Sequence, residues 1–336
     1  MTDSTEQTAR FSPVLFLLTL IALVWSGVLL FAGGFTTSIG AGMAFLDWPL
    51  SNGSLNPEGW LENTDQMAEH SHRIAGMIIG IIAIIIAIAY NRIEKRPAVR
   101  RLAYFLLALV IFQGLLGGLR VLLDNLNTGA DHNLIARSFA IAHAMGAQGV
   151  VVALCSLAVL SAPRWVRGLP GGRAGVAGSL GWISFSILVI AILIGAVMRH
   201  NAAGLAIQTF PQVNAAGDWI PSGGGFAVWV HFLHRTLGMI GGLGVIVYAL
   251  AALTRPDWHS YARQFAFAAV LLTCLQVWLG WLILETNRNP HVATLHMLNG
   301  AILIATLWAS LLWSSRAVEI KPSAIPSPLA ENSDVH

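Results

Sequence analysis

The sequence predicts an all-α integral membrane protein, with eight transmembrane helices as two duplicated four-helix bundles in the same orientation. Two observations support this fold class. First, 56% of the 336 residues are hydrophobic and 10% are charged, whereas roughly a quarter of the residues in soluble domains are charged. Second, one stretch of the chain recurs: EHSHRIAGMIIG at 69–80 resembles HFLHRTLGMIGG at 231–242.

The apolar runs are long enough to cross a bilayer, which requires about 18 residues or more. They predict spans at 13–32, 70–90, 102–123, 138–160, 177–198, 229–253, 264–286 and 291–313. Of the 19 Lys and Arg residues, thirteen fall on one alternating set of loops and tails and six on the other. Short loops rich in Lys and Arg stay in the cytoplasm, so we expect both termini inside. The long 33–69 loop, which has neither residue, is expected outside, and the simplest location is the plasma membrane of a bacterium.

The internal repeat extends beyond its first match. At the same offset of 162 residues, AGMAFLDWP (41–49) meets AGLAIQTFP (203–211). At 163 residues, QGLLGGL (113–119) meets QVWLGWL (276–282), and His143 corresponds to His296. Four spans in each copy keep both copies in one orientation. The expected organisation is a cytoplasmic segment 1–12, an N-terminal bundle 13–160, a cytoplasmic linker 161–176, a C-terminal bundle 177–313 and a cytoplasmic, disordered tail 314–336.

Four histidines lie near the outer ends of alternate spans. His72, His143, His234 and His296 each fall within the first two turns of a span that runs inward, roughly 5–9 Å below the surface. A lone membrane histidine is most often satisfied by a hydrogen bond between helices, but four at matching depth favour a functional role. Two imidazoles facing each other in a bundle suit the iron of a haem, whereas zinc would need about four convergent ligands.

Cationic and further imidazole groups lie close to these histidines. Arg73 and Arg235 follow them directly and could bind haem propionates; the alternative is anchoring at the membrane interface. Arg199, at the end of the fifth span, and His231, one turn before His234, are further candidates for contact with a cofactor. Neighbouring glycines could admit a flat ligand or serve ordinary helix packing. They are Gly76, Gly80, Gly117, Gly118, Gly238, Gly241 and Gly280.

Glu69 breaks the symmetry of the repeat, because His231 stands at the matching position. Glu69 and His72 are three residues apart and share a helix face, so the carboxylate could transfer protons beside a ligand on His72. The alternative is an acid favoured by the helix dipole. The second copy thus lacks the acid that the first copy carries.

Over roughly residues 13–313 the chain resembles the haem A synthase family. The resemblance rests on E-x-x-H-R at Glu69–Arg73, the second His-Arg at 234–235, two Q-x-x-L-G segments, His143, His296 and DWP at 47–49. It implies that His72 and His143 are axial ligands of the substrate haem O, that His234 and His296 hold a haem b cofactor, and that Glu69 is catalytic. The implied reaction oxidises a methyl group of haem O to a formyl group by successive hydroxylations, giving haem A for aa3-type terminal oxidases. Expected partners are haem O synthase, an unidentified electron partner and membrane lipid, and no nucleic acid.

The chain departs from the family pattern in two places. GGFTTSIGAG follows the first span, where many members carry Thr-Arg, and the two cysteines, Cys155 and Cys274, fall inside spans. It therefore resembles a cysteine-poor variant, without thiols in the outer loops. Two other functions remain open: a di-haem b-type electron carrier without chemistry on a bound haem, and a transporter whose histidines relay protons. Only the enzyme accounts for Glu69.

Overall fold

The computed structural model describes residues 10–126, 133–167, 175–255, 258 and 260–315. Over these residues the chain forms helices, with one isolated bridge between Ser51 and Ser54. The helices are α1 (Pro13–Ser38), α2 (Thr64–Ile93), α3 (Pro97–Leu126), α4 (Leu134–Ser161), α5 (Pro163–Val166), α6 (Gly175–His200), α7 (Phe226–Leu253), α8 (Ser260–Glu285) and α9 (Pro290–Ser314). Eight are long and apolar enough to cross a membrane, which confirms the predicted all-α membrane fold. Most of the expected segment 1–12, part of the linker and nearly all of the expected tail lie outside the described residues.

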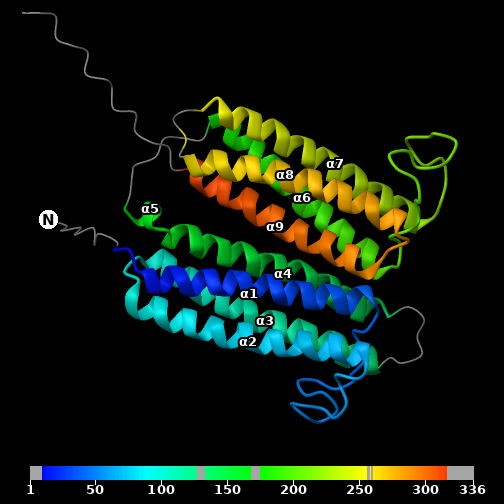
Figure 1. Ribbon diagram of the computed structural model, residues 1–336, viewed down its shortest axis with the longest axis horizontal. Helices are drawn as coiled ribbons and strands as arrows, with labels where there is room; N and C mark the ends of the chain where they lie inside the picture. The colour runs from blue at the N-terminus through cyan, green and yellow to red at the C-terminus, as the bar shows by residue number, and fades with distance from the viewer. Residues whose placement is uncertain (1–9, 127–132, 168–174, 256–257, 259, 316–336) are drawn as a thin grey trace, which may run out of the picture.

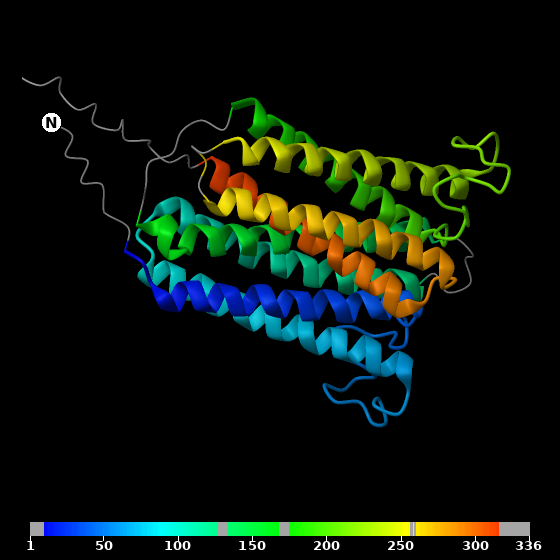
Figure 2. The ribbon, with the colours of Figure 1, turned by 45° about the horizontal axis from the view of Figure 1, so that its top comes forward.

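The eight long helices are arranged in two sets (Figures 1 and 2). Helices α1 to α4 pack together, and α6 to α9 pack beside them, with α1 and α4 contacting α9. The long loops after α1 and α6 lie at the same end of the molecule, opposite the end at which α1 begins. This arrangement agrees with two bundles in one orientation; their origin by duplication stays a prediction.

Capping residues set the helix starts nearest the histidines. Asn63 accepts the backbone N–H groups of Asp65 and Gln66, so α2 starts at Thr64 rather than at the predicted residue 70. Asn289 caps α9 in the same way, and Pro290 occupies its first turn, where the missing N–H costs nothing. Polar caps of this kind add a turn that hydropathy does not register. The caps thereby set how many turns His72 and His296 lie from the starts of their helices.

The end of the molecule opposite the long loops is closely packed. Tyr90 is fully buried and contacts the hydroxyls of Thr19 and Ser161. In the second set Tyr248 is equally buried and contacts Ser310. Because buried hydroxyls satisfy one another here, this end is a structural core. The predicted functional residues lie toward the other end.

Candidate functional site

The structure brings the four predicted histidines together as two pairs. His72 on α2 faces His143 on α4, with ring centroids 6.3 Å apart and planes at 82°. His234 on α7 faces His296 on α9 at the same 6.3 Å and 70°. Metal–imidazole bonds are about 2 Å long, so a metal held between two facing imidazoles separates their centroids by roughly 6 Å. Both pairs match that separation.

The ring nitrogens also fit a metal between the rings. His143 Nδ1 lies 3.0 Å from the Gln113 carbonyl oxygen, and His234 Nδ1 lies 2.8 Å from that of Ala191. A carbonyl at Nδ1 places the proton there and leaves Nε2 available to a metal. In the other member of each pair, His72 or His296, Nδ1 is buried without a hydrogen-bond partner among the described residues. His296 Nε2 contacts the Gln276 amide at 3.2 Å, and a metal on this nitrogen would replace that contact.

The number of ligands distinguishes between metals. Within the described part of the chain, no three His, Cys, Asp or Glu side chains gather closely enough to hold an ion. Zinc takes about four protein ligands, whereas iron in a porphyrin needs only axial ones. The donor set therefore fits haem better than a free metal ion.

In each pair, one glycine lies directly against the first histidine. A Cβ at Gly33 would stand 2.6 Å from Cε1 of His72, and one at Gly195 would stand 2.7 Å from Cε1 of His234. Any side chain there would displace the imidazole. The sequence analysis missed both residues, although their separation of 162 repeats the offset of the duplicated motifs.

Of the seven glycines named from the sequence, Gly118 packs against Trp48 and Gly241 against Leu188, and the other five fall into two groups. A Cβ at Gly117 would lie 3.2 Å from His143, and one at Gly280 would lie 3.2 Å from His296. A Cβ at Gly76, Gly80 or Gly238 would instead have no atom within 4 Å. The first group holds imidazoles close to a helix backbone, and the second leaves room beside the pairs.

A cavity of about 160 Å³ opens beside the second pair. Its polar lining comes from His231, His234, Arg235, Thr273, Gln276 and His296. Apolar residues make up most of the remaining wall, as is usual for cofactor sites. Two residues predicted from the sequence to contact a cofactor, His231 and Arg235, are therefore at this cavity.

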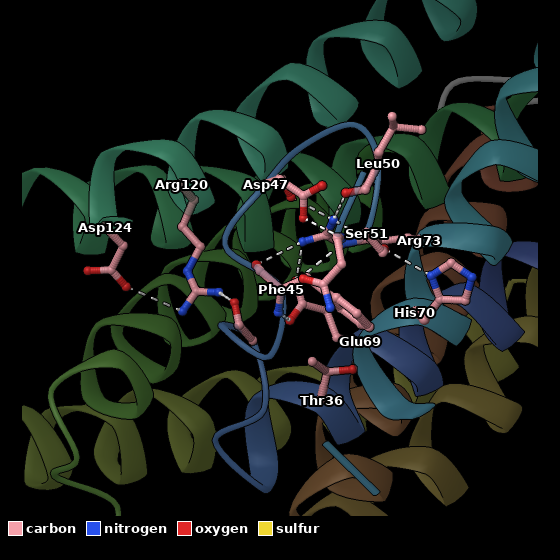
Figure 3. Close-up of polar contacts among 12 residues, drawn as sticks. Thr36, Phe45, Asp47, Leu50, Ser51, Glu69, His70, Arg73, Arg120 and Asp124 are labelled. Atoms are coloured by element: carbon pink, nitrogen blue, oxygen red, sulfur yellow. Dashed lines mark hydrogen bonds and ion pairs between the residues drawn. The ribbon is translucent and has the colours of Figure 1, made fainter. Parts of the chain in front are cut away.

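Glu69 and Arg73 join α2 to the first long loop (Figure 3). Arg73 Nη2 pairs with Glu69 Oε1 at 2.5 Å, and the same guanidinium donates to the carbonyls of Phe45, Asp47 and Leu50. Glu69 Oε2 accepts the backbone N–H of Phe45 at 3.1 Å. The carboxylate is buried, with both oxygens engaged.

The second long loop is held in the same way without a carboxylate. His231 Nδ1 accepts the N–H of Ile207 at 3.2 Å, and Arg235 donates to the carbonyls of Thr209, Pro211 and Gln212. The corresponding loop residues are again 162 apart, as with Phe45 and Ile207. Both arginines therefore fasten loops, and their contact with propionates stays a prediction.

Arg199 lies between the two helix sets. Its Nη2 donates to the Gly34 carbonyl at 2.6 Å and to the Ser38 hydroxyl at 2.7 Å, both on α1. Arg288 donates to the Ser38 carbonyl at 3.3 Å. Positive charge at the end of α1 is favoured by the helix dipole, so the contacts seen for Arg199 join the sets, and its predicted contact with a cofactor stays untested.

Eight apolar helices with two facing imidazole pairs toward one end define a multi-pass membrane protein with two bis-histidine sites. The chain matches the model of the COX15-CtaA family, described as cytochrome oxidase assembly protein, over residues 16–226 and 225–331. It belongs to that family. It is 30% identical over 277 residues to the heme A synthase of Halalkalibacterium halodurans, covering 80% of this chain and 86% of that one. It is 28% identical over 293 residues to the heme A synthase of Alkalihalophilus pseudofirmus, covering 83% and 90%. The resemblance inferred from the motifs is confirmed.

Proposed function

We propose that this chain is a haem A synthase-type oxidoreductase, which oxidises a methyl group of haem O to a formyl group by successive hydroxylations. The product, haem A, serves the biogenesis of aa3-type terminal oxidases. The heme A synthases among its relatives support this function. The observation that carries it is geometric: two imidazole pairs have the same spacing, but in the part of the chain that the structure describes a buried carboxylate, Glu69, lies one turn before the first pair and none before the second.

The two pairs take different haems in this proposal. His72 and His143 hold the substrate haem O, and His234 and His296 hold a resident haem b. Bound haem supplies the redox and oxygen chemistry that side chains lack. The two imidazoles of each pair would hold the haem, and the apolar helices around the pairs would exclude water.

Glu69 acts as the proton acceptor of the first site. Conversion of a methyl to a formyl group removes protons as well as electrons, and a positioned carboxylate accelerates proton transfer. Arg73 holds Glu69 in place through Nε and Nη2. The second set carries His231 at this position, so it holds a haem without acting on it and serves electron transfer.

The orientation follows from the distribution of charge. With both termini in the cytoplasm, the long loops and both imidazole pairs lie toward the outer face of a bacterial plasma membrane. Haem O is strongly hydrophobic, so direct transfer from haem O synthase is the expected route of supply. Electrons leave to a partner that remains to be identified.

The competing function is a di-haem b-type electron carrier. It explains the two pairs as well as the enzyme does, but not Glu69. Full-length protein expressed with haem O in a host that makes no haem A separates the two. Haem A in the extracted pigment, identified by mass, supports the enzyme. Bound haem with no haem A would establish the carrier, and a purified protein without Soret absorbance would contradict both.

A further inference from the structure

The first helix set contains buried amide groups that lack hydrogen-bond partners. Both side-chain atoms of Gln113 on α3, and Oε1 of Gln148 on α4, are buried with no partner in the described residues. Each side chain is 8% exposed. An unpaired buried polar group is costly, so a native structure rarely keeps one without a reason.

Gln113 lies beside the first imidazole pair. Its backbone carbonyl contacts His143, and its side chain faces Gly146, where a Cβ would overlap the amide. Gln148, five residues beyond His143, lies about 140° around α4 from it, on the face of Cys155, which packs with the second helix set, so Gln148 points away from the pair. Further along α3, Val110 lines an apolar crevice too narrow for water.

The second set satisfies the corresponding amide internally. Gln276, which matches Gln113, contacts His296 Nε2 at 3.2 Å and accepts a hydrogen bond from Asn299 at 2.7 Å. Asn299 stands where the first set has Gly146, and Ala301 stands where it has Gln148. Among the described residues, the Gln276 amide therefore has a partner in Asn299 that does not depend on a bound haem, whereas the Gln113 amide has none.

We propose that the side-chain amide of Gln113 hydrogen-bonds the hydroxyl on the isoprenoid side chain of haem O and thereby selects it over haem B. This inference rests on the proposed function. Haem O carries the hydroxyl on the porphyrin edge away from its propionates, and haem B has no hydroxyl there. With propionates toward the loop end, where Arg73 and Arg120 lie, that edge meets the Gln113 amide. A site built to bond a hydroxyl discriminates strongly against the analogue that lacks it.

The test compares binding of the two haems to the full-length purified protein, with the resident haem of the second pair in place. Titration followed in the Soret band gives the ratio of the dissociation constants for haem B and haem O. We expect Gln113→Met to reduce this ratio about tenfold, the value of one hydrogen bond, whereas Gln148→Met, on the other face of α4, should leave the ratio unchanged. Leu116→Met, a volume-conserving change on the same helix, is the matched control and should leave the ratio unchanged.

An unchanged ratio in Gln113→Met, with the resident haem spectrum intact, overturns the proposal. An equal reduction in Gln148→Met overturns it as well, because the effect would then not depend on an amide that faces the site. Failure of the wild-type protein to convert haem O at all would contradict the proposed function instead. The spectrum of the second pair reports separately that each variant is folded.

Discussion

The two long loops are fastened to their helices by the same contacts, with one exception. In each, an arginine binds loop carbonyls, and a residue four positions earlier accepts a loop N–H. That residue is Glu69 in the first set and His231 in the second. Within the described residues, Arg73 pairs with a carboxylate and Arg235 does not.

The comparison separates a structural role from a chemical one. Since His231 anchors its loop as a neutral acceptor, anchoring alone does not require an acid at this position. What Glu69 adds is negative charge and the capacity to take up a proton, at the cost of burying an ion pair. The simplest reason for that addition is the reaction at the first imidazole pair.

The largest expected effect comes from replacing this acid. Glu69→His, which reproduces the second set, and Glu69→Gln should each lower haem A formation about a hundredfold or more, the usual contribution of a positioned proton acceptor. Both variants retain an acceptor for the Phe45 N–H and should still bind haem O. The measurement is the extracted haem A, with the hydroxylated intermediate, by mass. Full formyl product from Glu69→His would show that the acid serves only the loop.

Removal of the arginines should affect stability unequally. Arg73→Met leaves the buried Glu69 carboxylate without its cation, and we expect a loss of about 3 kcal/mol in the free energy of unfolding. Arg235→Met removes only hydrogen bonds to carbonyls, and we expect about 1 kcal/mol. Unfolding in detergent, followed by helical circular dichroism, measures both. Equal losses would mean that the ion pair adds nothing to the first loop.

The glycines behind the imidazoles allow a matched pair of substitutions. Gly195→Ala places a methyl 2.7 Å from Cε1 of His234, so the ring must move, and resident haem affinity should fall about tenfold. Gly27→Ala adds the same methyl on α1, outside the cavity lining and with no atom within 4 Å, and should leave the affinity unchanged. The haem content per protein, from a pyridine-haemochrome spectrum, tests both. Equal haem content in the two variants would place the cofactor elsewhere.

The smallest effect is a pH dependence confined to the first loop. Burial tends to raise the pKa of Asp47, but hydrogen bonds from the Gly53 and Asn52 N–H groups outweigh it and hold this pKa below its ordinary value of 3.8. Because the pKa of Asp47 is lower in the folded protein, the ionised carboxylate stabilises the loop at pH values above its ordinary pKa. This stabilisation is lost as the pH falls through the folded pKa. Thr209 stands at this place in the second loop. An acid-resistant protease should therefore cut the first loop more readily below about pH 4, and Asp47→Ala should show the same cleavage at all pH values. Equal sensitivity of the two loops would contradict the assignment.

Much of the fold could be predicted from the sequence, because membrane spans and their histidines depend on local composition and on the repeat. The pairing of His72 with His143 followed from depth and helix order alone. The loop contacts could not be predicted, since they depend on where the chain between α1 and α2 folds back. For the same reason the sequence suggested that Glu69 was a carboxylate facing His72 and did not show its pairing with Arg73.

Other features were missed for different reasons. Gly33 and Gly195 obey the repeat offset, but two glycines in apolar helices carry no distinctive signal. The short helix α5 falls in the predicted linker, where four residues are too few for a periodic pattern. Gln113 was noted only as part of a matching segment, because its lack of a partner depends on packing against Gly146.

The central claim is that the two imidazole pairs hold different haems, and side-by-side analysis of two variants tests it most directly. His72→Ala and His234→Ala are purified from cells supplied with haem O, and the haems extracted from each are quantified by mass. The account predicts that His72→Ala keeps haem b and loses haem O and haem A, whereas His234→Ala loses haem b and still binds haem O. Loss of the same haem from both variants, or of neither, would contradict it.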